Sequence, residues 1–249
     1  MDKKYIIKPI NLVYIVFALI YGALLAVFIA YFKRYSLPIR EMAVMGFFLF
    51  DWIIFALYKY SISKDEELAS ICYQNGFNWL NELPFNTCNI VLFTVPLGII
   101  TKSRLLLSTS LFSSLIVTPL ALLMPCRGFD NYSLLKPRIF GFYLTHYLTL
   151  SAGILLLAFG ILVPNVHDVL LAAIGMFALL TLVYLINKVM RITGINPYAN
   201  YFFCIEPDGN KALEMLKKLI PCEYFYCLPL VLIFAFLSYL LTIAIHLFV

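Results

Sequence analysis

Long apolar runs, separated by shorter polar segments, recur along the whole chain. Most runs approach the length of about 20 residues that an α-helix needs to cross a hydrocarbon core roughly 30 Å thick. The alternating segments of about 10 residues that are typical of barrel strands do not describe them. We therefore predict an all-α integral membrane fold, a bundle of seven transmembrane helices. The predicted spans are roughly 11–32, 42–60, 85–101, 104–124, 139–163, 168–189 and 225–248.

Two of the polar segments, 61–84 and 207–222, are longer than simple connectors. Both are predicted to lie in the membrane interface, although each could instead be a solvated loop packed against the bundle. In the second segment, Asp208 or Asn210 could cap a short amphipathic helix. Its apolar and basic sides would be formed by Leu213, Leu216, Leu219 and Ile220 and by Lys211, Lys217 and Lys218, respectively. Neither segment has the size of a soluble domain, so residues 1–249 are expected to form a single membrane domain.

Composition supports a membrane protein and excludes two other classes. The 249 residues are 63% hydrophobic and 12% charged, whereas a soluble domain is roughly half apolar and a quarter charged. This difference excludes a soluble globular enzyme. The 22 Phe, 17 Tyr and 2 Trp residues exclude a disordered chain, because disordered segments are poor in aromatic residues.

The basic residues indicate the orientation in the membrane. With seven spans, 13 of the 18 Lys and Arg residues fall on the side of the N-terminus and 5 on the other side. Because positive charge stays preferentially in the cytoplasm, we expect the N-terminus inside and the C-terminus outside. All six cysteines also fall on the side predicted to be cytoplasmic, where thiols stay reduced. We interpret the net charge of +5 as topological bias plus attraction to anionic lipid, and we expect no nucleic-acid partner.

Polar side chains inside the predicted spans are the candidates for function, because hydrocarbon penalises them unless they face the bundle interior. Cys88, Thr118 and His146 come from three different spans and should all lie in the cytoplasmic half of the bilayer. A cysteine and a histidine at one depth can supply a thiol nucleophile and an imidazole base. A structural interpretation is also open, with Cys88 as a small packing residue and His146 in an interhelical hydrogen bond. Asp51 could orient the imidazole, or it could be a structural carboxyl bonded to a neighbour.

No metal ion or cofactor is predicted. The cysteines lack CxxC spacing and the histidines are scattered along the chain, which is not the pattern of a metal site. His167 and His246 belong to the side predicted to be outside, and we expect both to be incidental.

Several short motifs together resemble a known family. They are Leu83-Pro84-Phe85-Asn86-Thr87-Cys88, Thr118-Pro119, His146, Ala199-Asn200-Tyr201 and Pro207. In this order they resemble the YwaF-like family of bacterial integral membrane proteins, which is similar to the eukaryotic transmembrane protein 164, regarded as a phospholipid acyltransferase. The resemblance covers nearly the whole chain. It implies a multi-pass protein of the bacterial cytoplasmic membrane, with a cysteine nucleophile at Cys88 and a histidine partner at His146.

The resemblance and the polar residues together predict a phospholipid acyltransferase. An acyl chain would pass from a phospholipid donor to a lysophospholipid acceptor through a thioester on Cys88, with His146 as the base. Candidates to stabilise the oxyanion or to contact the substrate are Asn86, Asn89, Thr118, Asn200, Tyr201 and Asp51. The apolar face of Val91, Leu92 and Val95 could line an acyl-chain groove or simply pack against the bundle. Two other functions stay open: a lipid-ester hydrolase that uses the same pair, and a non-enzymatic carrier or sensor for a small ligand.

The charge distribution generates a topological prediction. If the N-terminus is inside, Cys126 should react with a membrane-impermeant maleimide only from the cytoplasmic face. Labelling intact cells and inverted vesicles, followed by peptide mass analysis, measures this. Labelling of Cys126 from outside would reverse the orientation and the leaflet on which the protein acts.

Overall fold

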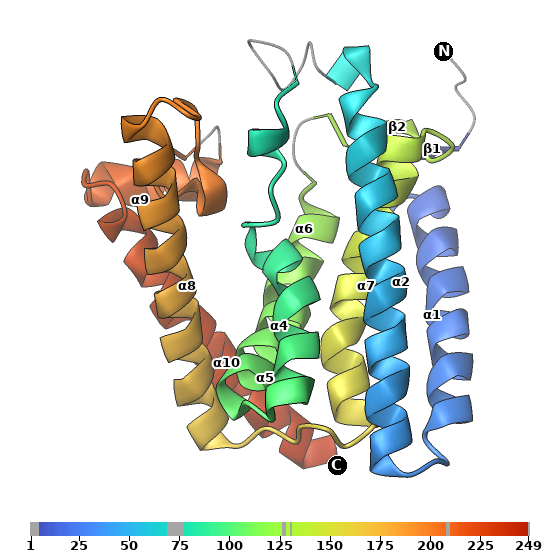
Figure 1. The fold of residues 1–249 in the computed structure, drawn as a ribbon. Coiled ribbons are helices and arrows are strands. Elements are labelled where there is room, and N and C mark those ends of the chain that lie inside the picture. Colours follow the sequence, from blue (N-terminus) through green and yellow to red (C-terminus); the bar gives the residue numbers. More distant parts are fainter. Residues whose placement is uncertain (1–4, 69–76, 126–127, 130, 208–209, 249) are drawn as a thin grey trace.

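Helices form nearly all of the regular structure in the computed structural model, which describes residues 5–68, 77–125, 128–129, 131–207 and 210–248 (Figure 1). The α-helices are α1 (Leu12–Phe32), α2 (Leu37–Ser63), α4 (Thr87–Thr101), α5 (Arg104–Phe112), α6 (Thr118–Leu123), α7 (Pro137–Ala158), α8 (Val166–Ile192), α9 (Lys211–Leu219) and α10 (Leu228–Phe248). A π-helix, η2 (Ser113–Val117), joins α5 to α6, and η1 (Trp79–Asn81), η3 (Tyr201–Phe203) and η4 (Phe225–Cys227) are 3₁₀ turns. The all-α prediction is confirmed, apart from one small strand pair.

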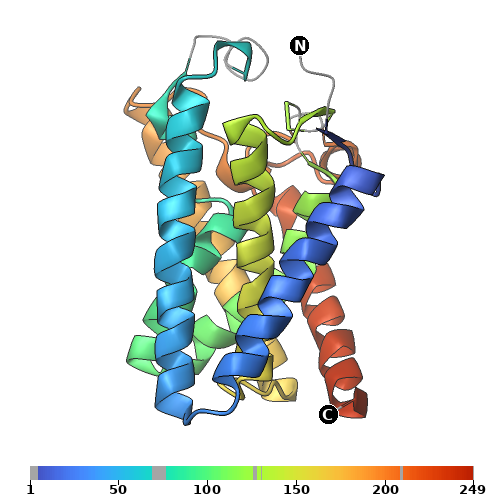
Figure 2. The same ribbon diagram turned by 90° about the vertical axis from the view of Figure 1, so that its right-hand side faces the viewer.

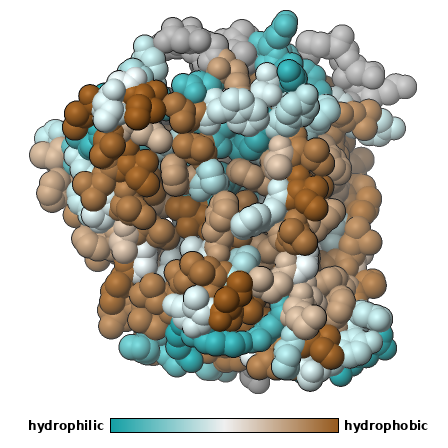
Figure 3. Space-filling view, in the orientation of Figure 1, coloured by the Kyte–Doolittle hydropathy of each residue, from teal (hydrophilic) through white to brown (hydrophobic). Residues whose placement is uncertain are grey.

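Six helical stretches in the described part of the chain are long and apolar enough to cross a membrane. They are α1, α2, the continuous stretch Arg104–Leu123, α7, α8 and Phe225–Leu247. Figure 3 shows apolar side chains over the middle of the molecule and hydrophilic ones toward both ends. The seventh predicted range, 85–101, holds only the 15-residue α4, about 22 Å long and therefore shorter than the hydrocarbon core. The count of seven spans remains a prediction.

Successive crossings of the bundle run in opposite directions, with α5, η2 and α6 together forming one crossing. In Figures 1 and 2, α1 begins at the end drawn uppermost and α10 ends at the opposite end. We call these the upper and lower ends. The upper end carries the basic residues predicted to be cytoplasmic that the structure describes, and five basic residues lie at the lower end: Lys33, Arg34, Arg40, Lys102 and Arg104.

Helix α7 occupies the centre of the bundle, where it packs against α1, α2, α4, α5 and α6. Two glycines permit its closest approaches. A Cβ atom at Gly141 would lie 2.6 Å from Cβ of Tyr58 on α2, and one at Gly153 would lie 2.5 Å from Oγ of Ser114 on η2. Small residues at such positions let helix backbones approach closely in a membrane. His146 lies between these two glycines. It therefore belongs to the central helix of the bundle.

The upper end contains the two predicted interfacial segments. α9 lies across the upper end of the bundle instead of along it (Figure 1), and Asn210 caps it by accepting hydrogen bonds from the N–H groups of Ala212 and Leu213. The alternative cap, Asp208, lies outside the described residues, as does Cys126. Of 61–84, the structure describes the end of α2, residues 64–68 and the stretch from 77 onward, which includes η1.

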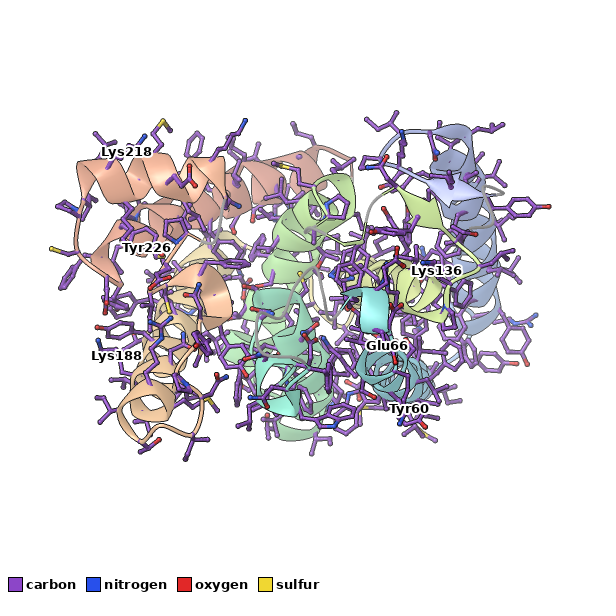
Figure 4. All side chains as sticks on the ribbon, turned by 90° about the horizontal axis from the view of Figure 1, so that it is seen from above. Tyr60, Glu66, Lys136, Lys188, Lys218 and Tyr226 are labelled. Carbon is purple, nitrogen blue, oxygen red and sulfur yellow. The ribbon has the colours of Figure 1, made fainter. Side chains whose placement is uncertain are left out.

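A strand pair and an ion-pair cluster at the upper end were not predicted. β1 (Ile6–Ile7) pairs antiparallel with β2 (Tyr132–Ser133). Beside β2, the fully buried Arg138 donates to Asp65 at 2.6 Å, and Lys136 pairs with Glu67. The hydrogen bond from Lys136 lowers the pKa of Glu67 from its usual range. Figure 4 shows Lys136 and Glu66 on one side of this end and Lys188 and Lys218 on the other.

At the lower end, Asp168 holds two elements together. Its carboxylate accepts from Arg104 Nε at 2.6 Å, from Ser108 Oγ at 2.9 Å and from the N–H of Asn165 at 2.8 Å. Asn165 and Asp168 form a capping box at the start of α8, which satisfies backbone donors that hydrocarbon could not. Asp168 therefore fixes α8 to α5, and its role is structural.

Replacing Asp168 tests this role. Asp168→Ala removes one half of the capping box and the carboxylate that accepts from Arg104, Ser108 and Asn165, and should lower the free energy of unfolding by about 2–4 kcal/mol. Thermal unfolding in detergent measures the effect. Glu41→Ala is the control, because Glu41 pairs with a Lys102 side chain that is 68% exposed and such pairs contribute about 0–1 kcal/mol. Equal losses in the two variants would contradict the assignment.

Candidate functional site

Cys88 lies inside the bundle because α4 begins below its upper end (Figure 1). The chain descends from η1 at the upper end before α4 starts, and Cys88 is in the first turn of α4, where it is buried. Pro96 within α4 cannot donate the hydrogen bond that would satisfy the Leu92 carbonyl, since proline has no N–H. The indole Nε1 of Trp52 on α2 donates to that carbonyl instead, at 2.8 Å. This bond holds α4 against α2.

The same bond gives the level of Cys88 in the membrane. α2 and α4 run antiparallel (Figure 1), and Trp52 is level with Leu92. Cys88 precedes Leu92 by about one helical turn, so it lies near the level of position 56 on α2.

His146 is close to that level. Tyr58 of α2 packs on Gly141 of α7, and these two helices also run antiparallel. His146 follows Gly141 by five positions, which places it near the level of position 53 on α2. The levels of Cys88 and His146 therefore differ by roughly 5 Å along the bundle axis. This similarity in depth supports the prediction made from the spans.

Thr118 of α6 lies beside Cys88 of α4. Thr118 is fully buried at the junction of η2 and α6, and its side chain interacts with the Cys88 thiol. The two groups are not aligned as a hydrogen bond, since Thr118 Oγ1 has no hydrogen-bond partner among the described residues. The π-helix that precedes Thr118 relieves the clash that Pro119 would cause with the carbonyl four positions earlier, and such turns are frequent at functional sites.

Of the two ring nitrogens of His146, only Nδ1 has a hydrogen-bond partner among the described residues. Nδ1 lies 2.7 Å from the carbonyl oxygen of Phe142, and a carbonyl can only accept a hydrogen bond. Nδ1 therefore carries the proton, which leaves the lone pair of Nε2 as the basic site. The Phe142 ring packs against the imidazole with 4.2 Å between centroids. No direct hydrogen bond joins His146 to Cys88 in the part of the chain that the structure describes, so the catalytic pair remains a prediction.

Asp51 lies near the depth of His146, but the two side chains are not in contact. It is fully buried, and neither carboxyl oxygen has a hydrogen-bond partner among the described residues. The structure records no contact between Asp51 and His146, and no bonded neighbour of the kind that the structural alternative required.

The remaining candidates divide between the start of α4 and the turn around η3. Asn86 is exposed and accepts from the N–H of Phe202 at 3.3 Å, whereas the half-buried Asn89 makes no side-chain hydrogen bond in the described structure. The Asn200 amide is engaged by its own loop, since Oδ1 accepts from Ile205 and Glu206 N–H groups. Asn89 and Thr118 are therefore the better placed candidates to contact a substrate.

The turn around η3 depends on a residue that the sequence did not single out. Asn187 of α8 is fully buried; it donates to the Tyr201 carbonyl at 2.9 Å and to Cys204 Sγ at 3.1 Å, and it accepts from the Tyr201 N–H at 3.0 Å. Burial, together with the charge of Glu82, raises the pKa of Tyr201 to about 12. Burial also raises the pKa of the Cys204 thiol, so Cys204 is not an activated nucleophile. An asparagine within an apolar run was the available signal.

An ion pair near the site was also missed. Lys59 of α2 pairs with Glu82, which lies between η1 and α4, and Lys59 acts electrostatically on His146. In the sequence, Lys59 contributes only to the positive charge that indicates the orientation. Its position within a helical turn of the end of an apolar span was the signal available.

The proposed acyl-chain face is packed. Val91, Leu92 and Val95 are each at most 1% exposed and belong to the main core of the bundle. This supports the packing interpretation over an open groove. Similarly, Ser110 bonds to Thr94 at 2.7 Å, so the serine-rich face of the fourth predicted span joins helices.

These features define a multi-pass integral membrane protein with a buried layer of polar side chains. The chain belongs to the TMEM164 family, whose model matches residues 6–242. The predicted relation to transmembrane protein 164 is thus confirmed, while the assignment to the YwaF-like bacterial group remains a prediction. No curated protein and no solved structure matches the chain.

The burial of the thiols predicts a pattern of reactivity. Cys222 is exposed, whereas Cys88, Cys204 and Cys227 are buried. A hydrophilic maleimide added to the protein in detergent should modify Cys222 quickly and the three others only after unfolding. Peptide mass analysis of the labelled protein checks this. Rapid modification of Cys88 by the hydrophilic reagent would show that water reaches it freely.

Proposed function

We propose that this protein is a membrane-embedded acyltransferase that moves an acyl chain between glycerophospholipids through a thioester on Cys88. The observation that carries the proposal is the common depth of two groups: a buried thiol in the first turn of a short helix, and an imidazole whose Nε2 is the basic nitrogen. Family membership supports a membrane protein of this kind. The reaction chemistry follows from the two side chains.

In the first step, His146 Nε2 accepts the proton of the Cys88 thiol while the sulfur attacks an ester carbonyl of the donor lipid. Collapse of the tetrahedral intermediate breaks the bond between the carbonyl carbon and the ester oxygen. The proton on His146 passes to that oxygen, so a lysophospholipid leaves with a free hydroxyl. The acyl chain remains on Cys88 as a thioester.

In the second step, His146 removes a proton from the hydroxyl of an acceptor lysophospholipid. The hydroxyl oxygen attacks the thioester, the carbon–sulfur bond breaks, and the proton returns to the sulfur of Cys88. No oxidant or cofactor is needed, because each step exchanges one acyl bond for another.

The first turn of α4 supplies donors for the oxyanion. The N–H groups of Thr87 and Cys88 donate to no backbone carbonyl in the described structure, and the Asn86 side chain does not cap the helix. Free N–H groups at a helix start favour negative charge. Asn89 and Thr118 could add side-chain donors.

The covalent intermediate provides the test. Incubation of the purified protein with a phospholipid donor should add one acyl chain to Cys88, and neutral hydroxylamine should remove it. Cys88→Ala should abolish both the adduct and turnover, and His146→Ala should slow acylation by about 10²–10⁴-fold, as loss of a general base does. Peptide mass analysis locates the adduct, and Cys222→Ala is the matched control that should retain both.

The assay also separates the alternatives. Product formation that requires added lysophospholipid supports transfer, whereas release of free fatty acid without an acceptor indicates a hydrolase. Full turnover by Cys88→Ala, or unfolding of His146→Ala in a thermal scan, would make these residues structural and favour the carrier.

A further inference from the structure

Lys59 and Glu82 form an ion pair that is largely enclosed by protein. Their nitrogen and oxygen atoms lie 2.5 Å apart, and the side chains are only 12% and 13% exposed. The ammonium also lies 5.2 Å from the centroid of Phe55 and 4.9 Å from that of Tyr58. By comparison, the lysine side chains paired at Glu67 and Glu223 are 31% and 39% exposed.

Stability does not explain such a pair. Removing two charges from water costs about as much as their attraction returns, and apolar residues of similar size are often as stabilising. An ionisable residue near the end of a membrane span is therefore a functional candidate. The ammonium offers three donors and Glu82 Oε2 is its recorded hydrogen-bond acceptor, so capacity for a second anion remains.

The pair lies on the interface side of the candidate site. Lys59 is next to Tyr58, which packs on Gly141 at the upper end of α7, and position 59 is about three residues, or roughly 5 Å, above the level of Cys88. Its charge also acts on His146. From the upper end inward, the order is an ammonium, a thiol with an imidazole, and then apolar core.

A glycerophospholipid presents its groups in the same order. The phosphate lies at the interface, the ester carbonyls lie a few bonds deeper, and the acyl chains follow. We propose that Lys59 binds the phosphate of the donor phospholipid, which replaces Glu82 as its partner, and so places an ester carbonyl at Cys88. The inference rests on the proposed function for the identity of the lipid.

We expect the carboxylate of Glu82 to occupy the position that the lipid phosphate takes after binding. Glu82 neutralises Lys59 in the empty site, and its carboxylate competes with the incoming anion. Glu82 precedes the Leu83-Pro84 segment that leads into α4, so its release from Lys59 would couple lipid binding to the start of the helix that carries Cys88.

Binding to the Cys88→Ala protein in a phosphate-free maltoside detergent tests the proposal without turnover. Isothermal titration compares a short-chain phosphatidylcholine with the matching diacylglycerol, which has the same ester groups and no phosphate. Lys59→Gln, added to Cys88→Ala, should weaken phosphatidylcholine binding roughly tenfold to hundredfold and leave diacylglycerol binding unchanged. Lys59→Arg should retain most of the affinity.

A second substitution separates headgroup binding from a purely structural role of the ion pair, because the two predict opposite changes in phosphatidylcholine affinity. Glu82→Gln removes the competing anion and should tighten phosphatidylcholine binding, whereas a purely structural ion pair would be weakened by loss of either partner. Lys188→Gln is the control; Lys188 pairs with Glu223, and Figure 4 places it across the bundle from Tyr60, the neighbour of Lys59. Equal effects on both lipids, or weaker binding in Glu82→Gln, would overturn the proposal.

Two further outcomes are distinguishable. Inorganic phosphate should not compete, because it has no acyl chains to hold it at this depth, and effective competition would assign the site to free phosphate and overturn the lipid proposal. Turnover that survives Cys88→Ala would remove the proposed function, while a phosphate preference that depends on Lys59 would still establish the headgroup site. Loss of that preference alone would remove only this inference.

Discussion

Hydrocarbon offers no hydrogen bonds, and this constraint organises the molecule. Each polar group within the bundle must find a partner in the protein, on its own helix or on another, or lie unpaired at a cost. The Leu92 carbonyl freed by Pro96 is satisfied by Trp52, and Asp168 is satisfied by Arg104 and Ser108. Such bonds join helices that apolar packing alone would leave free to slide, so they determine the depth of each residue.

Some of the buried polar groups that lack a hydrogen-bond partner among the described residues lie near the depth of the candidate site. Thr118 Oγ1 and both oxygens of Asp51 have no hydrogen-bond partner among the described residues, and two N–H groups open the first turn of α4. A bundle selected only for stability would satisfy or replace these groups. Under the proposed function, a bound lipid would complete the hydrogen bonds of Thr118, which lies beside Cys88.

The shortness of α4 matters for the chemistry. A full-length span would begin at the interface and place its first turn among the headgroups, but α4 starts lower in the bundle (Figure 1). In the proposed membrane arrangement, the first-turn donors and the Cys88 thiol would lie below the headgroups, where a helix start stabilises negative charge more strongly than in water. The Lys59–Glu82 pair lies above this turn, toward the upper end, and is largely enclosed by protein.

Sequence by itself determined the membrane class and the approximate ranges of six crossing helices, because hydropathy is a property of single segments. It narrowed the cap of α9 to Asp208 or Asn210 and singled out Cys88, Thr118 and His146 as candidates. It overestimated the length of the third span, since an apolar run does not reveal where a helix starts. Only the tertiary structure decided the partners: Trp52 with Leu92, Lys59 with Glu82, and Asn187 with the η3 turn. Each partner comes from a different element, and the depth and rotation of packed helices depend on close contacts such as Gly141 against Tyr58, which hydropathy along a single chain does not specify.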